Sequence, residues 1–385
     1  MDAVELFVGA GGLGLGVSNA KFDPQTVIEL DKYACDTLRE NKRRRLPKIS
    51  KWPLWQGDVR DFDYSTVKGD IQLVSGGPSC QPFSIGGRHR AYADERDMFP
   101  EAIRAVRELK PKAFIFENVK GLTRVTFAAY FKYIELQMSY PEIVARDGED
   151  WADHLGRLER HHTTGRDTGL TYRVVSRVLN AANFGVPQRR ERVFFVGFRA
   201  DLGIEWTFPK ETHSQNSLLW NQLHGDYWDR HEIPERHRWA DARLKLRASR
   251  LEAKPESKAW QTIRDALAGL PDPETEPEAS CAFLNHNYQP GARSYVGHTG
   301  SPVDEPAKTL KAGVHGVPGG ENMLRRPDGS VRYFSVRESA RLQTFPDRFA
   351  FHGSWSESMR QLGNAVPVKL AQVIAEDIYV HLSAL

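Results

Sequence analysis

The fold is decided by residues 4–14, VELFVGAGGLG, in which a short apolar run leads straight into a glycine-rich turn. An apolar run of this length is typical of a buried strand. The glycines match the pattern G-x-G-x-x-G, which lets the backbone of a strand-to-helix turn approach a ligand closely. Glu29 ends the next apolar run, where an acid can bind ribose hydroxyls. The stretch favours a ligand that contains adenosine, although a tight turn without a ligand gives the same pattern.

Outward from this turn, apolar runs alternate with segments of helical character. We expect strands at residues 26–30, 71–74, 113–116, 172–179 and 192–198, and helices around residues 31–41 and 98–109. This alternation predicts a doubly wound, mostly parallel α/β sheet. Ligands bind at the carboxyl ends of such strands. Gly9, Glu29, Glu117 and the loop after Val74 are therefore expected to meet there.

Two stretches depart from the alternation and suggest the domain organisation. Residues 123–171 are polar and read as a helical insertion. Residues 201–349 are rich in Pro, Gly, His and Trp, which predicts a smaller, loop-rich domain with a hinge. Residues 350–385, with an amphipathic helix at 368–382, are expected to return and complete the domain formed by residues 1–200.

Composition excludes several classes of protein. The chain has 385 residues, and no stretch approaches the roughly 18–20 apolar residues of a membrane span. The first residues do not resemble a signal peptide, so a cytoplasmic protein is expected. Cys35, Cys80 and Cys281 are widely spaced, which argues against a disulfide framework and a structural zinc site.

The net charge of +3 is weakly basic, but residues 41–51 hold six basic side chains and no acid. Such a patch suits a polyanionic partner, with an ordinary solvated surface as the alternative.

Cys80 stands out among the cysteines. It lies in GGPSCQPFS, residues 76–84, directly after an expected strand, and glycines and prolines restrict the backbone around it. A cysteine held over a ligand cleft suits a nucleophilic thiolate. Cys35 falls within an expected helix, where a buried structural role is favoured, and Cys281 has no evident partner.

Taken together, the motifs resemble those of the DNA (cytosine-5)-methyltransferases of bacterial restriction–modification systems, over residues 4–200 and 333–375. The matching segments, in the family's order, are FVGAGG (7–12), ELD (29–31), GDV (57–59), GGPSCQPFS (76–84), ENV (117–119), QRRER (188–192), RESARLQTFP (337–346) and GNAVP (363–367). Two departures stand out: Ser79 occupies the place of a usual proline, and Asp97-Met98 stand where a glycine often lies.

The resemblance implies S-adenosylmethionine as cofactor and no metal. The expected cofactor contacts are Phe7, Gly9, Ala10, Gly11, Gly12, Glu29, Asp31, Asp58, Val59, Pro78, Met98, Asn364 and Val366. It also implies a mechanism in which Cys80 attacks carbon 6 of cytosine and a protonated Glu117 donates to ring nitrogen 3. Arg190 and Arg192 are then expected to hold the base.

The implied substrate is duplex DNA, with the target cytosine flipped out of the stack. The expected DNA contacts are Gln81, Ser84, Gln188, Arg293, Lys308, Lys311 and His315. The family also implies a monomer in the bacterial cytoplasm, associated with the nucleoid. A companion restriction endonuclease would act on the same DNA sequence without direct contact.

Three alternatives remain open on the sequence. A related enzyme that methylates cytosine in transfer RNA is the first alternative; the long segment 201–334 favours a reader of DNA, but nothing in it excludes RNA. A nicotinamide-dependent oxidoreductase would account for the glycine turn but not for Cys80, Glu117 and the arginine pair. A catalytically inactive DNA-binding regulator would not need Cys80 and Glu117.

Overall fold

A computed structural model covers the chain, and the structure describes residues 1–79, 97–165, 169–239, 241–312 and 322–385. Within these residues, no helix combines the length and the apolar composition needed to cross a membrane.

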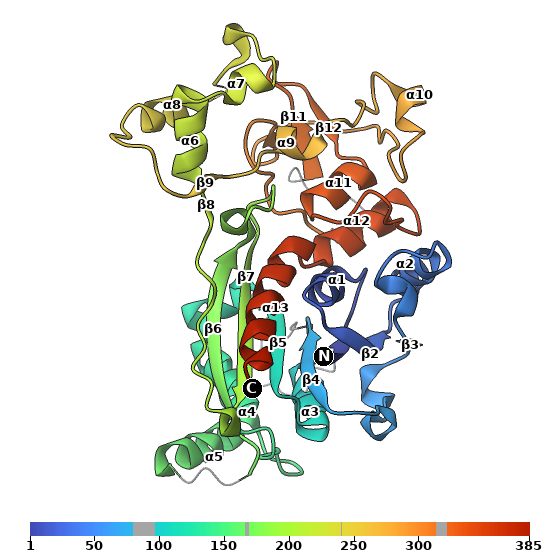
Figure 1. Ribbon diagram of the computed structural model, residues 1–385, viewed down its shortest axis with the longest axis vertical. Helices are drawn as coiled ribbons and strands as arrows, with labels where there is room; N and C mark the ends of the chain where they lie inside the picture. Colours follow the sequence, from blue (N-terminus) through green and yellow to red (C-terminus); the bar gives the residue numbers. More distant parts are fainter. Residues whose placement is uncertain (80–96, 166–168, 240, 313–321) are drawn as a thin grey trace.

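A seven-stranded sheet forms the centre of the fold, in the order β3-β2-β1-β4-β5-β7-β6 (Figure 1). Its strands are β1 (Asp2–Leu6), β2 (Asp23–Glu29), β3 (Leu54–Gln56), β4 (Ile71–Gly76), β5 (Ala113–Val119), β6 (Tyr172–Asn180) and β7 (Glu191–Arg199). Strands β1 to β5 are parallel, and β7 is antiparallel to both β5 and β6. The predicted doubly wound sheet is confirmed. The three-residue strand β3 was not predicted, because it is too short for its pattern to stand out.

Helices cover both faces of this sheet. The sheet and its flanks carry α1 (Gly12–Asn19), α2 (Lys32–Arg43), α3 (Phe99–Leu109), α4 (Ala128–Ser139), α5 (Trp151–Thr164), α12 (Trp355–Asn364) and α13 (Val368–Ser383). Alternate residues of a strand point to opposite faces. Phe114 and Phe116 accordingly pack in a core with α3 and α4, whereas Ala113 and Ile115 pack in a second core with α1 and α13.

The C-terminal segment returns to the start of the chain through close contacts at two glycines. A Cβ atom at Gly12 would lie 2.3 Å from the carbonyl oxygen of Val366. At Gly16 it would lie 2.5 Å from the Cβ atom of Ala371 on α13. Only glycine allows backbones to approach this closely. These contacts hold the C-terminal segment beside the glycine turn.

The described residues of 209–342 are called the loop-rich region. This region lies at the end of the molecule opposite to α4 and α5 (Figure 1). Its elements are β8 (His213–Ser214), α6 (Gln215–His224), α7 (Tyr227–Arg230), α8 (Ala242–Ala248), β9 (Lys258–Ala259), α9 (Ile263–Leu267), α10 (Pro277–Ser280), β10 (Ser301–Pro302), β11 (Met323–Arg325), β12 (Val331–Tyr333) and α11 (Val336–Leu342). Two small apolar clusters stabilise it, one around Ile263 and Phe334 and one around Tyr227 and Trp260. The remaining residues, 1–208 and 343–385, are called the sheet region below.

The passages between the two regions can be located from core packing. Trp206 and Phe208 still pack with α13 in a core of the sheet region. On the return, Phe345 and Phe349 pack in a cluster with residues of α12. The segment expected as an insertion contains α4 and α5, and Tyr130, Tyr133 and Ile134 of α4 belong to a main core.

Candidate active site

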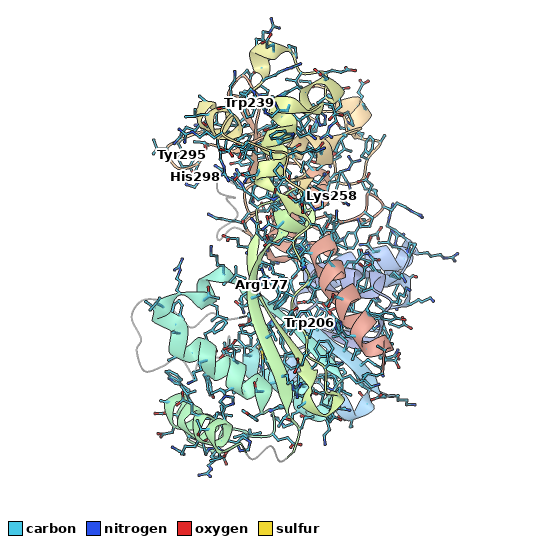
Figure 2. All side chains as sticks on the ribbon, turned by 60° about the vertical axis from the view of Figure 1, so that its left-hand side comes forward. Arg177, Trp206, Trp239, Lys258, Tyr295 and His298 are labelled. Carbon is cyan, nitrogen blue, oxygen red and sulfur yellow. The ribbon has the colours of Figure 1, made fainter. Side chains whose placement is uncertain are left out.

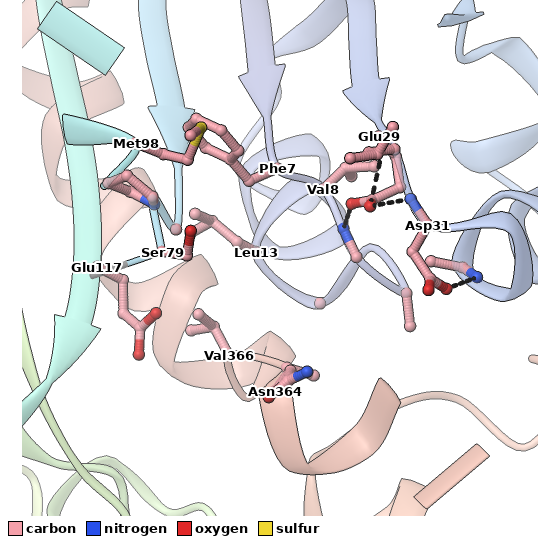
Figure 3. A pocket seen from close by; sticks show the side chains of 18 of the residues that line it. Phe7, Val8, Leu13, Glu29, Asp31, Ser79, Met98, Glu117, Asn364 and Val366 are labelled. Atoms are coloured by element: carbon pink, nitrogen blue, oxygen red, sulfur yellow. Dashed lines mark hydrogen bonds between the residues drawn. The ribbon is translucent and has the colours of Figure 1, made fainter. Parts of the chain in front are cut away.

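A cavity of about 720 Å³ lies at the carboxyl ends of the parallel strands. It is lined by residues from the glycine turn, the ends of β2, β4 and β5, and the C-terminal segment around α12. Every expected cofactor contact except Gly11 lines this cavity. Figure 3 shows Glu29 and Asp31 at one end of the cavity, and Glu117, Ser79 and Met98 at the other. The strand-end positions inferred from the sequence therefore converge on one space.

Glu29 ties the glycine turn to the end of β2. Its Oε2 atom accepts a hydrogen bond from the backbone N–H of Gly9 at 2.6 Å. Its Oε1 atom accepts from the N–H groups of Leu30, at 2.9 Å, and Asp31, at 2.7 Å. Burial raises the pKa of Glu29, and these three hydrogen bonds oppose the rise because they stabilise the carboxylate. The carboxylate is thus fixed in place with lone pairs left for a ligand.

Gly9 and Gly11 have different roles in the turn. Gly9 has φ +54°, and a Cβ atom there would have no other atom within 4 Å, so a ligand can approach this residue closely. Gly11, with φ +88°, is instead the residue that caps the start of α1, and a Cβ atom there would lie 3.0 Å from Trp52 and 3.1 Å from Leu38. The structure therefore does not bring Gly11 to the cavity: its left-handed backbone shapes the turn, and its α-carbon faces the neighbouring core.

Asp31 and Asp58 each line the cavity and precede a helical element, α2 for Asp31 and a single short turn for Asp58. Asp31 caps α2 by accepting from the N–H of Ala34 at 2.9 Å, and it forms an ion pair with Arg360 at 3.0 Å. Asp58 accepts from the backbone N–H and the guanidinium of Arg60. These hydrogen bonds lower the pKa of Asp58, so it is ionised at neutral pH.

Glu117 and Arg192 form the charged end of the cavity. They face each other from neighbouring antiparallel strands, with Arg192 Nε 2.8 Å from Glu117 Oε1. The contact is an ion pair without hydrogen-bond alignment, since Oε1 has no hydrogen-bond partner among the described residues. Burial raises the pKa of Glu117, while the charges of Arg192 and Arg190 act against the rise. Glu117 is only 7% exposed, and this burial favours retention of a proton on its carboxyl group.

Arg190 and Gln188 occupy positions that the sequence did not reveal. Arg190 is fully buried, does not line the cavity, and donates to the carbonyl oxygens of Leu310 at 3.1 Å and Gly363 at 2.7 Å. Gln188 is also fully buried, donates to the Leu342 carbonyl and accepts from the Leu310 N–H. Gln188 was expected to contact DNA and Arg190 to hold the base, but the hydrogen bonds of both side chains are made to backbone groups inside the protein. Both side chains join the segment that precedes β7 to the loop-rich region.

The other expected DNA contacts lie in the loop-rich region or outside the described residues. Arg293 is exposed, and Lys308 is half-buried with its Nζ atom 3.2 Å from Thr299 Oγ1. Lys311 is exposed on the segment that follows Leu310. Cys80, Gln81, Ser84 and His315 lie outside the described residues.

Several residues that line the cavity were not predicted from the sequence. Leu30 lines the cavity with 63% of its surface exposed, although it belongs to the recognised ELD motif. Arg360 and Gln361 line it from α12, three and two residues before the recognised GNAVP motif. Asn118 lines it and donates to the carbonyl oxygen of Pro78 at 2.9 Å. Spacing within these motifs could have indicated Leu30 and Asn118, whereas Arg360 depends on how α12 packs.

The sequence of the chain that forms this cavity matches a known family. The family model described as C-5 cytosine-specific DNA methylase matches residues 1–139 and 158–380. The chain therefore belongs to the C-5 cytosine-specific DNA methylases and is a DNA (cytosine-5-)-methyltransferase. This membership overturns the nicotinamide-dependent alternative. Residues 140–157, between the two matched stretches, fall within the segment expected as an insertion.

Relatives of the chain are bacterial type II methyltransferases. It is 30% identical to M.PspPI of Psychrobacter sp. (strain TA137) over 391 residues, 99% of this chain and 79% of the relative. It is 30% identical to M.FnuDI of Fusobacterium nucleatum over 404 residues, 98% of this chain and 94% of the relative. The solved structure of Dnmt2 from S. pombe matches with a TM-score of 0.57 and 18% identity, covering 100% of this chain and 99% of that one. The structural likeness shows the shared fold.

Proposed function

We propose that the chain methylates carbon 5 of a flipped-out cytosine within a short duplex DNA sequence. In this proposal S-adenosylmethionine is the methyl donor and Cys80 is the covalent nucleophile. The observation that carries it is the cavity itself, which joins the buried Glu117–Arg192 pair to the Glu29 end through one continuous wall. Ser79, the last described residue before Cys80, lines the same wall.

The cavity fits S-adenosylmethionine. The anchored carboxylate of Glu29 suits the ribose hydroxyls, and the ionised Asp58 with the N–H of Val59 suits the adenine amino group and ring edge. Phe7, Pro78 and Met98 offer apolar surface toward the Glu117 end, and the open space at Gly9 admits a ligand close to the backbone. When bound, the cofactor supplies a methyl group carried on a positively charged sulfur.

The chain's own residues activate the cytosine. The thiolate of Cys80 forms a bond to carbon 6, and the electron pair of the carbon 5–carbon 6 bond moves toward ring nitrogen 3. Glu117 gives its proton to that nitrogen, which leaves carbon 5 as the nucleophilic carbon of an enamine. After carbon 5 receives the methyl group, nitrogen 3 returns its proton to Glu117. Loss of the carbon 5 proton to a base then breaks the bond to carbon 6 and releases the thiolate.

Arg192 and Arg190 support this step in different ways. The forked guanidinium of Arg192 reaches the cavity, where it holds Glu117 and is available to the oxygen of the base. Arg190 lies behind it and acts as a positioning residue through the carbonyl groups of Leu310 and Gly363. Burial lowers the pKa of Arg190, but guanidinium groups stay protonated in proteins, so its charge still acts on Glu117.

The loop-rich region is proposed to read the DNA sequence. Arg293, Lys308 and Lys311 belong to it, and such side chains can contact phosphates and base edges in the major groove. Since the relatives are named type II methyltransferases, we further propose a role in restriction–modification, with the enzyme acting as a monomer in a bacterial cytoplasm. Bisulfite sequencing of DNA from an expressing host would give the recognition sequence.

The central experiment traps the covalent intermediate. A duplex of several kilobases made with 5-fluoro-2′-deoxycytidine in place of every deoxycytidine contains the target whatever its sequence. With S-adenosylmethionine present, the enzyme should form a stable adduct, because fluorine cannot leave as the proton does. The Cys80→Ala variant should form none. Equal behaviour of the two proteins would refute the mechanism.

A parallel assay separates DNA from RNA as substrate. Transfer of a radiolabelled methyl group should be at least about a hundredfold faster to duplex DNA than to transfer RNA. A site whose polar groups are placed to bind one substrate discriminates to this degree against another that leaves them unpaired. Comparable rates would favour the transfer RNA alternative. A protein that binds DNA and transfers no methyl group to either would be the inactive regulator.

A further inference from the structure

The chain is held at two points immediately before Cys80. The carbonyl oxygen of Pro78 accepts a hydrogen bond from the side-chain amide of Asn118, which follows Glu117 on β5, at 2.9 Å. The carbonyl oxygen of Ser79 accepts one from the backbone N–H of Met98 at 3.0 Å. Met98 directly precedes α3 and lines the cavity. Residues 79 and 98, far apart in sequence, are therefore joined by a backbone hydrogen bond.

Asp97 fixes the position of Met98. One carboxylate oxygen, Oδ1, accepts from the backbone N–H of Phe99, the first residue of α3, at 3.2 Å. The other, Oδ2, accepts from the hydroxyl group of Tyr130 on α4. A carboxylate that accepts a helix N-terminal N–H is favoured both by the hydrogen bond and by the helix dipole. Tyr130 is only 5% exposed and packs in a main core.

These contacts form a chain from a core helix to the residue before the nucleophile. We propose that Tyr130 is a positioning residue, which through Asp97 and Met98 fixes the Ser79 carbonyl one peptide bond before Cys80. The inference rests on the proposed function, because it assumes that Cys80 attacks the base. Asn118 holds the neighbouring Pro78 carbonyl from the Glu117 strand, so the two carbonyls preceding Cys80 are fixed from two different elements.

The hydrogen bonds that link Tyr130, Asp97, Met98 and Ser79 are called the brace below. The brace includes the two places where this sequence departs from the family pattern. Ser79 replaces a proline whose ring would restrict the backbone by itself. Asp97 stands where a glycine often lies, and a glycine offers no carboxylate to Tyr130 or Phe99. Stiffness that proline supplies through its covalent ring can therefore be supplied here by hydrogen bonds, in which Tyr130 takes part from a segment outside the recognised motifs.

The chain offers a matched pair of variants for the test. Tyr130 and Tyr133 both lie on α4, and both are buried with a hydrogen-bonded hydroxyl group. The hydroxyl of Tyr133 is 2.8 Å from His154 Nδ1 and is not connected to Ser79 by any of these contacts. Tyr130→Phe and Tyr133→Phe each remove one hydroxyl and keep the ring. Their effects on stability should be similar, so a difference in chemistry reports on the brace.

The measurement is the rate of adduct formation with the fluorinated duplex at saturating S-adenosylmethionine. Tyr130→Phe should slow it by about 3- to 10-fold, as expected for loss of one hydrogen bond that orders a reacting group. Tyr133→Phe should match the wild-type rate, and both variants should show similar Tm values. Cofactor affinity, measured by calorimetry, should stay within about twofold of wild type for both, since neither hydroxyl lines the cavity.

A double-mutant cycle completes the test. Asp97→Asn should slow adduct formation like Tyr130→Phe, and the double variant should be no slower than the slower single variant, because both act through one contact. Equal rates for Tyr130→Phe and Tyr133→Phe, or additive effects in the double variant, would overturn the brace. If the wild-type enzyme itself forms no adduct, the proposed function fails instead, so the two failures are distinguishable.

Discussion

The sheet region and the loop-rich region place their buried acids in different surroundings. In the sheet region, Glu5 on β1 is 1% exposed, receives a hydrogen bond from Ser75, and has no cation within ion-pair distance among the described residues. In the loop-rich region, Glu338 is equally buried but is bonded through both carboxylate oxygens to Arg332, at 2.6 and 2.7 Å. Figure 1 shows the loop-rich region above the sheet region.

The difference follows from the size of the cores. The sheet region buries its acids among large apolar clusters, where burial raises the pKa values of Glu5 and Glu117. The loop-rich region has small clusters, and ion pairs such as Arg332–Glu338 and Arg264–Asp304 fix its loops. Burial thus favours a proton on Glu117 beside the cavity despite its ion pair with Arg192, while Glu338 in the loop-rich region acts as a structural link. Five predictions test this contrast, in order of decreasing effect.

Glu117→Gln should reduce methyl transfer by about 10² to 10⁴-fold, because an amide cannot give a proton to nitrogen 3. In the wild type, activity should fall as pH rises through the raised pKa of Glu117, since the acid must be protonated. Single-turnover transfer of a radiolabelled methyl group measures both. The control is Glu135→Gln on α4, where burial also raises the pKa but the carboxyl group contacts Ser176 away from the cavity. Equal losses of methyl-transfer activity in the two variants would show that Glu117→Gln acts through folding and not through proton donation.

Glu338→Ala should lower the free energy of unfolding by about 3–5 kcal/mol, because it leaves the buried Arg332 guanidinium without its partner. It also removes the capping box that Glu338 forms with Ser335 at the start of α11. Urea unfolding followed by fluorescence measures the change. Glu159→Ala, at the exposed ion pair that α5 forms with Lys132 of α4, is the comparison and should cost less than about 1 kcal/mol. Similar losses would remove the distinction between buried and exposed links.

Glu5→Gln should change how stability depends on pH. Burial raises the pKa of Glu5 to about 8, so the folded state binds a proton that the unfolded state releases near its ordinary value. Wild-type stability should therefore fall as pH rises from about 5 to 8, by roughly 3.5 kcal/mol at most from this group. The glutamine variant lacks this term and should be the more stable protein at pH 8.5. Parallel pH profiles of Tm for the two proteins would refute the assignment.

Asp58→Asn should weaken S-adenosylmethionine binding by about tenfold, the value of one charge-assisted hydrogen bond. The matched control is Asp63→Asn. Both acids precede a short helical turn and accept from an N–H two residues on, but only Asp58 lines the cavity. Titration calorimetry compares the two Kd values. If Asp63→Asn weakens binding equally, the effect comes from the turn and not from a contact with the cofactor.

Arg293→Ala should have the smallest effect, a loss of about one unit in the slope of log affinity against log salt concentration for duplex DNA. Arg293 is an exposed side chain of the loop-rich region. Arg160→Ala, an exposed position on α5 at the opposite end of the molecule, should leave the slope unchanged. Figure 2 shows Tyr295 and His298, close to Arg293 in sequence, at the surface of the loop-rich region. An unchanged slope for Arg293→Ala would place the phosphate contacts elsewhere.

The sequence determined the sheet and most of the cavity. Parallel strands end at one edge, so acids and glycines that follow apolar runs must gather there, as Glu29, Asp58 and Glu117 do. Local patterns suffice because direction along a strand fixes which end of the sheet a residue reaches. The same reasoning missed β3, whose three residues carry too little pattern, and gave only coarse limits for the loop-rich region.

Only the tertiary structure decided which polar side chains face the cavity and which are buried in hydrogen bonds within the protein. Arg190 and Gln188 share a motif with Arg192, yet the packing of the segment before β7 against the loop-rich region buries the first two and leaves the third at the cavity. The Arg360–Asp31 pair and the Tyr130–Asp97 contact join residues distant in sequence. Such contacts depend on how close the helices approach, which is set by the packing of whole elements and leaves no periodic trace in the chain.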